Sequence, residues 1–257
     1  MKMNYKKPVT RIERLLRYID TVDIALASYF VSRNPKNVFG CEIGVLFGGW
    51  SISLMLKQEL KMFGVDPYSW ASGVDAKNEL YANLKDHDLE SRFELLSSVD
   101  ELSVICLENQ QKIHIAHVDG EHSEKATLAD LKALAPLMSD EGIIIVDDWC
   151  HPMFPGVHSA LHQFMAGSEF RMFAVTDRKA YLASANASND LQDQLVSGFL
   201  LQQNFNWCWQ HARDPVGPGG ESADIVAPEF GTVAEYTIDS HVLGQRVALI
   251  LGNRSKN

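Results

Sequence analysis

Residues 113–149 constrain the fold of this chain more than any other stretch, because two apolar segments in it each run into carboxylates. Residues 113–118 read as a first strand. Leucines recur every three residues between positions 123 and 138, which predicts a helix with one apolar face. After a predicted break at residues 140–142, the β-branched run at 143–146 reads as a second strand. A strand, a helix and a strand in this order predict a βαβ unit, whose two strands are parallel.

The acidic residues of this unit fall where open parallel sheets bind ligands, at the carboxyl ends of the strands. Asp119 follows the first strand, and Asp147 and Asp148 follow the second. Neighbouring strands lie about 4.8 Å apart, so these three carboxylates can reach one common point. Carboxylates that close repel one another unless a cation holds them together. The stretch therefore predicts a ligand or cation site at this edge of the sheet.

The composition fits a soluble α/β protein. A chain of 257 residues with 46% hydrophobic residues suits one such domain with additions. The formal net charge of −10 argues against nucleic acid as the main partner, and no apolar run approaches the length of a membrane span. The polar N-terminus predicts no signal peptide. The four cysteines have no metal-type or paired spacing, and three lie in or beside apolar runs, which predicts reduced thiols and a cytoplasmic location.

A glycine-rich turn between a strand and a helix predicts a place for a nucleotide-like ligand. Residues 37–44 read as the strand, and a helix is expected to begin near Trp50. Glycine lets the backbone approach a ligand, and the start of a helix offers free N–H groups. The spacing is not the G-x-G-x-x-G of dinucleotide enzymes, and the acid before the first glycine suits a ligand with positive charge. The candidate contacts are Glu42, Gly44, Phe47, Gly48, Gly49 and Ser51.

Two further strand ends carry candidate contacts for such a ligand. Asp66 follows the predicted second strand, where an acid accepts hydrogen bonds from both hydroxyls of a ribose; the alternative is an aspartate that only starts a turn. Ser97 and Ser98 follow a third predicted strand, at residues 93–96, and are candidate contacts of an adenine. An N-cap of the helix expected at residues 99–109 is the alternative role for these serines.

Together these motifs resemble the class I S-adenosylmethionine-dependent methyltransferases. VDGEHS at 118–123 and IIIVDDW at 143–149 resemble the metal-dependent sugar O-methyltransferases of macrolide and aminocoumarin biosynthesis and their cephalosporin hydroxylase-like relatives. The resemblance covers roughly residues 37–183. It implies a Rossmann-like, doubly wound, mostly parallel sheet with an antiparallel edge hairpin. It also implies S-adenosylmethionine as methyl donor and a hydroxyl of a small molecule, such as a sugar or glycosylated natural product, as acceptor.

The resemblance also implies roles for single residues. Asp119, Asp147 and Asp148 correspond to metal ligands, with Mg²⁺, or Mn²⁺ in its place, as the cation. Asp119 lies next to the expected donor site as well, so it is also a candidate donor contact. His122 corresponds to the general base of the macrolide enzymes, whereas Glu121 occupies the position that other relatives use as base. Both side chains therefore remain candidates.

The rest of the chain predicts additions to this domain. Three segments are expected, an N-terminal helical segment at 1–36, the methyltransferase domain at 37–183 and a C-terminal extension at 184–257. The extension is expected to cap the active site or to form a dimer contact, and a homo-oligomer is expected. Two other functions stay open, a hydroxylase-like or other enzyme on the same scaffold and a non-catalytic ligand-binding protein. Further elements expected are a helix within 9–31, a hairpin at 170–183, a helix at 188–205 and strands at 232–238 and 246–251.

Overall fold

The computed structural model describes residues 19–70, 72–176, 178–196, 211–212, 232–238 and 245–251. The strands are β1 (Phe39–Ile43), β2 (Lys61–Val65), β3 (Phe93–Leu96), β4 (Ile113–Val118), β5 (Met138–Val146), β6 (Phe170–Val175), β7 (Ala180–Ser184), β8 (His211–Ala212), β9 (Thr232–Ile238) and β10 (Gln245–Leu251). The α-helices are α2 (Thr21–Arg33), α3 (Gly49–Lys57), α4 (Gly73–Asp86), α5 (Val99–Glu108), α6 (Glu124–Leu134), α7 (Pro155–Ala166) and α8 (Ala185–Val196).

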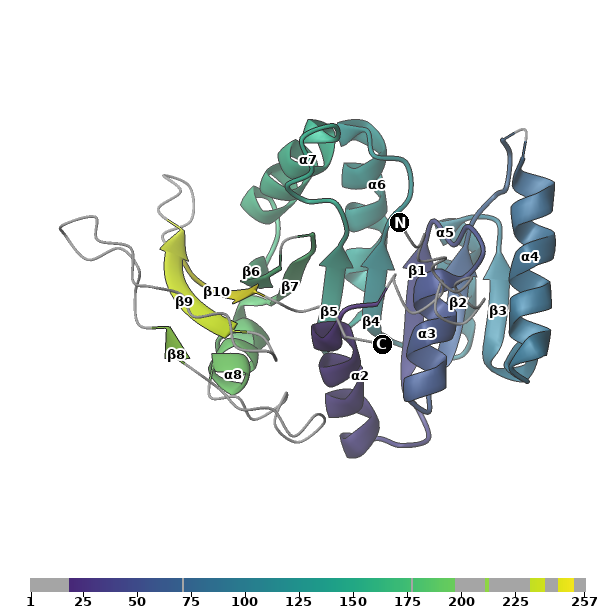
Figure 1. Cartoon of the computed structure of the whole chain (residues 1–257), viewed down its shortest axis with the longest axis horizontal. Coiled ribbons are helices and arrows are strands. Elements are labelled where there is room, and N and C mark those ends of the chain that lie inside the picture. The colour runs from purple at the N-terminus through teal and green to yellow at the C-terminus, as the bar shows by residue number, and fades with distance from the viewer. Residues whose placement is uncertain are drawn as a thin grey trace, which may run out of the picture.

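All ten strands of the described residues join one sheet, in the order β3-β2-β1-β4-β5-β7-β6-β10-β9-β8 (Figure 1). The strands β3, β2, β1, β4 and β5 pair in parallel, and β7 is antiparallel to both β5 and β6. The strand order reverses between β1 and β4, so the crevice at their carboxyl ends is the expected place for a ligand. The predicted doubly wound sheet with an antiparallel hairpin is confirmed.

Helices cover both faces of the sheet, each over its own apolar cluster (Figure 1). The helices α2, α3 and α4 contribute to one cluster, and α5, α6 and α7 contribute to the other. The centre of the sheet is buried on both sides. Ile143 and Ile145 of β5 belong to the first cluster, and Ile144 and Val146 belong to the second. A continuous apolar run such as this is typical of a central parallel strand.

The central βαβ unit forms as predicted, with one correction at its second strand. Ser123 caps α6 by accepting a hydrogen bond from the Ala126 N–H at 3.3 Å. The helical pattern ends before residues 140–142, but the second strand begins earlier than the predicted residue 143, because β5 starts at Met138. Glycine allows this, since a Cβ at Gly142 would lie 2.9 Å from the carbonyl oxygen of Ser139. The register of the pairing between β4 and β5 shifts between Ile113 and Ile115.

The additions at both ends of the chain extend the same fold. The part of the expected N-terminal helix that the structure describes is α2, and residues 1–18 lie outside the described residues. The helix expected at 188–205 begins earlier, as α8, and the two late strands are present as β9 and β10. β10 pairs in parallel with β6, so the extension continues the edge of the sheet. Within the described part of the chain, no helix has the length and apolar character that crossing a membrane requires.

Candidate active site

The glycine-rich turn after β1 lies directly against the end of β4. Gly44 and Gly48 adopt left-handed backbone conformations, with φ of 84° and 82°. A Cβ at Gly44 would lie 2.1 Å from the carbonyl oxygen of Asp119, so no other residue fits there without a shift of the backbone. The Asp119 N–H also donates to the Ile43 carbonyl at 2.8 Å. The predicted donor turn and the first predicted metal ligand are therefore neighbours.

Asp66 holds this turn in place from the end of β2. Its Oδ2 accepts hydrogen bonds from the N–H groups of Val45 and Leu46, at 3.0 and 3.1 Å. Its Oδ1 accepts one from the Tyr68 N–H at 2.9 Å. Each carboxylate oxygen has two lone pairs, so a ribose can still bind to Asp66, and that role stays a prediction. The alternative of a turn-forming aspartate describes what the carboxylate does in this structure.

Glu42 connects the start of α3 with β4 in the interior. Its side chain is buried and accepts hydrogen bonds from both the N–H and the hydroxyl of Ser51, in the first turn of α3. Its Oε1 lies 3.4 Å from Nδ1 of His117. Burial raises the pKa of Glu42, while the hydrogen bonds from His117 and Ser51 act in the opposite direction. Contact of Glu42 with a positively charged ligand remains a prediction.

The remaining candidate donor contacts have structural partners of their own. Ser98 caps α5 by accepting a hydrogen bond from the Glu101 N–H, as the alternative interpretation expected. The Ser97 N–H donates to the Glu101 carboxylate at 2.8 Å. The Phe47 carbonyl accepts a hydrogen bond from the Asn83 side chain, and Gly49 is the first residue of α3. An adenine contact at these serines stays a prediction.

The three predicted metal ligands form two overlapping groups instead of one. Asp119 belongs to both groups, with His117 and Asp147 on one side and with His122 and Asp148 on the other. Within each group the possible ligand atoms all lie within 4.8 Å of one another. Asp147 is 3% exposed, whereas Asp119 and Asp148 are partly exposed. The site therefore has a buried half and an outer half that meet at Asp119.

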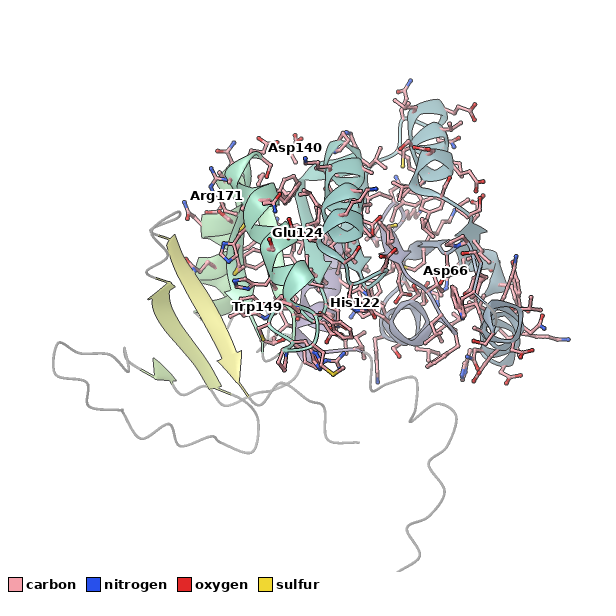
Figure 2. All side chains as sticks on the ribbon, turned by 90° about the horizontal axis from the view of Figure 1, so that it is seen from above. Asp66, His122, Glu124, Asp140, Trp149 and Arg171 are labelled. Carbon is pink, nitrogen blue, oxygen red and sulfur yellow. The ribbon has the colours of Figure 1, made fainter. Side chains whose placement is uncertain are left out.

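His122 belongs to the outer half. Its Nε2 lies 3.3 Å from Oδ1 of Asp119 and 3.4 Å from Oδ2 of Asp148, and its ring stacks on Phe154. The neighbouring Asp119 carboxylate raises the pKa of His122, with burial acting against it and the charge of Asp148 adding to it. Glu121 is exposed and is not in either group of the described residues. Figure 2 looks onto this edge of the sheet and shows His122 lying between Trp149 and Asp66.

Asp147 has a cationic partner that the sequence did not identify. Arg178, at the turn between β6 and β7, places one guanidinium nitrogen 3.0 and 3.3 Å from the two carboxylate oxygens of Asp147. The Asp148 N–H donates to the same carboxylate at 2.9 Å. Burial alone would raise the pKa of Asp147, but His117, Lys179 and Arg178 outweigh it and hold that pKa well below its usual value. The position of Arg178 in a hairpin turn at the same sheet edge is the signal that could have indicated it.

His117 is the second residue that the sequence did not identify. It lies on β4, two residues before Asp119, so both side chains point to the same face of the sheet. The ring is 1% exposed and stacks on Trp50, with centroids 4.6 Å apart. Burial lowers the pKa of His117, but Asp147, Glu42 and Asp119 raise it to about 9.

A buried ion pair lies beneath this site and ties α2 to the hairpin. Lys179 is 1% exposed, and its Nζ lies 2.6 Å from Oδ2 of Asp23, which is fully buried. The same carboxylate accepts hydrogen bonds from Trp50 Nε1 and the Tyr181 hydroxyl, each at 2.9 Å. Trp50 connects this group to His117. The N-terminal helix is thus held to the floor of the candidate active site.

The sheet order and the position of the glycine turn can be compared with the expected methyltransferase fold. An S-adenosylmethionine-dependent methyltransferase of class I has a doubly wound sheet in the order 3-2-1-4-5-7-6, and the described strands begin in this order. The glycine turn after β1 and the acid after β2 occupy the places where the nucleoside end of the donor binds in such folds. The described fold therefore agrees with the resemblance to class I methyltransferases that the sequence motifs carry.

Comparison with known proteins agrees with this class. Residues 41–149 match a family model described as a methyltransferase domain, so the chain contains such a domain. No curated protein matches the chain.

Three solved structures are examples of those that resemble this chain. A putative caffeoyl-CoA O-methyltransferase from Staphylococcus aureus is 14% identical, with a TM-score of 0.51 over 68% of this chain and 92% of the other. CalS11, a TDP-rhamnose 3'-O-methyltransferase, is 18% identical, with a TM-score of 0.47 over 68% and 81%. The O-methyltransferase NovP is 16% identical, with a TM-score of 0.48 over 64% and 78%. The similarity to the Staphylococcus aureus structure, at 14% identity, supports the fold alone.

Proposed function

We propose that this protein is a divalent-metal-assisted O-methyltransferase, which transfers the methyl group of S-adenosylmethionine to a hydroxyl of a small molecule such as a sugar. The observation that carries the proposal is the contact between Gly44 and Asp119. This contact places the expected donor turn beside the carboxylates and His122. A donor, a cation site and a base side by side are what methyl transfer to a weakly acidic hydroxyl requires.

The residues of the site fit a divalent cation. Three carboxylates gather at one sheet edge, and the buried Nε2 of His117 has no hydrogen-bond partner within the described residues. Asp119, Asp147 and Asp148 would hold the ion, and their hard oxygen atoms suit Mg²⁺ or Mn²⁺. When bound, the ion would lower the pKa of the acceptor hydroxyl and fix its position.

The chain's own residues would supply the proton transfer. His122 Nε2 faces the carboxylates of Asp119 and Asp148, which orient the ring, and the stacking on Phe154 fixes its plane. We infer that this nitrogen accepts the hydroxyl proton while the oxygen attacks the methyl group in line with the sulfur. The C–S bond breaks, its electron pair stays on sulfur, and the products are S-adenosylhomocysteine and a methyl ether. Glu121 is the alternative base, but its exposed position outside both groups favours His122.

The test is a methyl-transfer assay on purified protein. A panel of nucleotide sugars, glycosides and phenols is incubated with S-adenosylmethionine, with and without a chelator. We expect S-adenosylhomocysteine to form in equal amount to a methylated acceptor, to stop with chelator and to resume with Mg²⁺ or Mn²⁺. Calorimetry should detect binding of S-adenosylhomocysteine. If no binding is detected, the assignment of S-adenosylmethionine as methyl donor is contradicted. Oxygen consumption without methylation would favour the hydroxylase-like alternative.

Three further expectations belong to this proposal. The C-terminal extension would cap the active site or form a dimer contact, since β9 and β10 continue the sheet beyond β6. A homo-oligomer and a cytoplasmic location remain predictions from the sequence. Light scattering of the purified protein measures the first, and localisation of a tagged chain measures the second.

A further inference from the structure

We propose that His117 is a nitrogen ligand of the divalent ion at this site. The inference rests on the metal-dependent function proposed above and names a ligand that the carboxylate motif alone does not contain. It changes the expected metal, because imidazole nitrogen favours ions such as Mn²⁺, Fe²⁺, Co²⁺ or Zn²⁺ over Mg²⁺.

The first support is an unpartnered nitrogen that faces two carboxylates. His117 is 1% exposed, and its Nε2 has no hydrogen-bond partner among the described residues. This nitrogen lies 3.7 Å from Oδ2 of Asp147, which is too long for a hydrogen bond. His117 also offers a ring nitrogen within 4.8 Å of a carboxylate oxygen of Asp119. A buried polar atom without a partner is costly, so a ligand that completes this group has a physical reason to bind.

The second support is the partner of the other ring nitrogen. A histidine that binds a metal nearly always donates its second N–H to a carboxylate or carbonyl, which fixes the tautomer and the ring orientation. Nδ1 of His117 lies 3.4 Å from the buried carboxylate of Glu42. With its proton on Nδ1, His117 donates to Glu42 and presents the Nε2 lone pair to Asp119 and Asp147. The stacking on Trp50 holds the ring plane in this orientation.

The competing interpretation makes His117 a structural cation between Glu42 and Asp147. Two observations weigh against this role. Asp147 already accepts hydrogen bonds from Arg178 and from the Asp148 N–H, so its charge has partners without the imidazole. His117 Nε2 and Asp147 Oδ2 lie 3.7 Å apart. An ion between these two atoms would coordinate both after a small movement of the side chains.

The arrangement also connects the metal to the methyl donor. Glu42 accepts the hydrogen bonds of Ser51 at the start of α3 and faces His117 with its other oxygen. An ion held by His117 would therefore be connected, through Glu42, to the helix start that follows the donor turn.

The experiment measures whether nitrogen coordinates bound Mn²⁺, with Mn²⁺ alone as the probe. Pulsed electron paramagnetic resonance detects coupling between Mn²⁺ and a directly bonded ¹⁴N. The parent protein is compared with His117→Phe, His122→Phe and His114→Phe. Phenylalanine at 117 keeps an aromatic ring against Trp50. His114 is a matched control near the start of the same strand, where its ring accepts from the Phe39 N–H, and it belongs to neither group of possible metal ligands among the described residues. Calorimetry gives the Mn²⁺ affinity of each variant.

We expect nitrogen coupling in the parent, in His122→Phe and in His114→Phe, and its loss in His117→Phe. The Mn²⁺ affinity of His117→Phe should fall by about tenfold or more, on the scale of perturbed ligand shells. If His117→Phe does not fold, the His122→Phe protein still decides, because nitrogen coupling there supports His117 and its absence contradicts it.

Other outcomes separate this inference from the proposed function. A parent protein that binds Mn²⁺ through oxygen alone overturns the role of His117 and leaves the carboxylate site standing. Coupling that persists in His117→Phe but disappears in His122→Phe assigns the nitrogen to His122 instead. A parent that binds S-adenosylhomocysteine but no divalent ion overturns the inference together with the metal requirement, and one that binds neither overturns the methyltransferase proposal as well.

Discussion

At the scale of single residues, the structure separates three carboxylates that look alike in the sequence. Asp147 is buried and bonded to Arg178, and its pKa is held below the usual value. Asp148 is partly exposed, and burial together with the charges of Asp147 and Asp119 raises its pKa. The surroundings therefore stabilise the charged form of Asp147 and disfavour the charged form of Asp148, although the two residues are neighbours in one motif.

This difference predicts opposite effects on the metal-free protein. Because carboxylates that close repel one another, the sequence alone predicts that removing any of the three charges relieves repulsion in the metal-free protein. With the structure, Asp148→Asn should stabilise the protein by a few tenths to about 1 kcal/mol, because its charge is solvent-screened and repelled. Asp147→Asn should destabilise it by about 1–3 kcal/mol, since Arg178 loses its charged partner. Urea unfolding in the presence of chelator measures both, and equal effects would contradict the distinction.

The proposed base predicts a second effect. His122→Ala should lower turnover by roughly 10²–10⁴-fold, the range for a lost general base, with donor affinity nearly unchanged. Glu121→Gln is the matched control and should remain near the parent, because Glu121 is exposed and outside both groups. Single-turnover rates with saturating donor and metal give the comparison. Loss of activity in Glu121→Gln alone would exchange the two roles.

Asp66 gives a third prediction at this scale. Asp66→Ala should weaken S-adenosylhomocysteine binding by roughly 2–4 kcal/mol, because a charged acceptor of ribose hydroxyls is lost. The carboxylate also holds the turn through Val45 and Leu46, so part of the loss could come from that turn. Tyr68→Phe controls for this, since it removes the hydroxyl bond to the Leu46 carbonyl and leaves Asp66 in place. Calorimetry on both folded variants should find the larger loss in Asp66→Ala.

At the scale of elements, buried charge joins parts of the chain that are distant in sequence. Asp23 of α2 pairs with Lys179, which directly precedes β7, beneath the candidate active site. Trp50 of α3 and Tyr181 of β7 donate to the same carboxylate. This group positions α2 on the sheet and supports His117 through Trp50.

Breaking this ion pair should be costly. Lys179→Met leaves the Asp23 charge buried without its ammonium partner and should destabilise the protein by about 3–5 kcal/mol. Adding Asp23→Asn should recover much of that loss, because the amide is neutral and its oxygen can still accept from Trp50 or Tyr181. Chemical denaturation of the two single variants and the double variant forms the required cycle. If the losses of unfolding free energy in the two single variants add up to the loss in the double variant, a direct pairing of Asp23 with Lys179 is contradicted.

At the scale of the whole molecule, buried ionisable groups predict how stability depends on pH. Burial raises the pKa of Asp20 and of Asp130 to about 6, so the stability from their protonated forms is complete below the ordinary value of 3.8 and is lost as pH rises through 6. In the metal-free protein, where no bound ion displaces the second proton of the ring, the pKa of His117 is raised to about 9, so its stabilisation is present below 6.5 and is lost as pH rises through 9. Asp147, whose pKa is lowered, stabilises the protein above 3.8 and loses this effect in acid.

These terms together predict that the metal-free protein is most stable near about pH 4 and loses stability toward pH 9. The melting temperature in chelator, measured from pH 4 to 9, gives the profile. Asp130→Asn should flatten its decline between pH 5 and 7, because the group that loses its proton there is gone. A stability that rises steadily from pH 5 to 9 would contradict the assignment of these groups.

The sequence by itself determined the order of the elements and the edge of the sheet where the chemistry is expected. Strands and helices follow from local patterns of apolar residues, and β3 and β4 form where those patterns place them. The resemblance, carried by short motifs, placed Asp119 and the glycine turn beside one another. The strands and helices are local properties, because each follows from the spacing of residues within one segment, whereas Asp119 and the glycine turn meet only because β1 pairs with β4.

Only the tertiary structure decided which charges meet. His117 looks like one more residue of a buried strand, and Arg178 and Lys179 look like a hairpin turn. Their partners, Asp147 and Asp23, come from other elements, and only packing of the sheet brings them within bonding distance. The same packing divides the three carboxylates into a buried half and an outer half. Energies of buried charges depend on neighbours in space, and the spacing of residues along the chain does not contain that information.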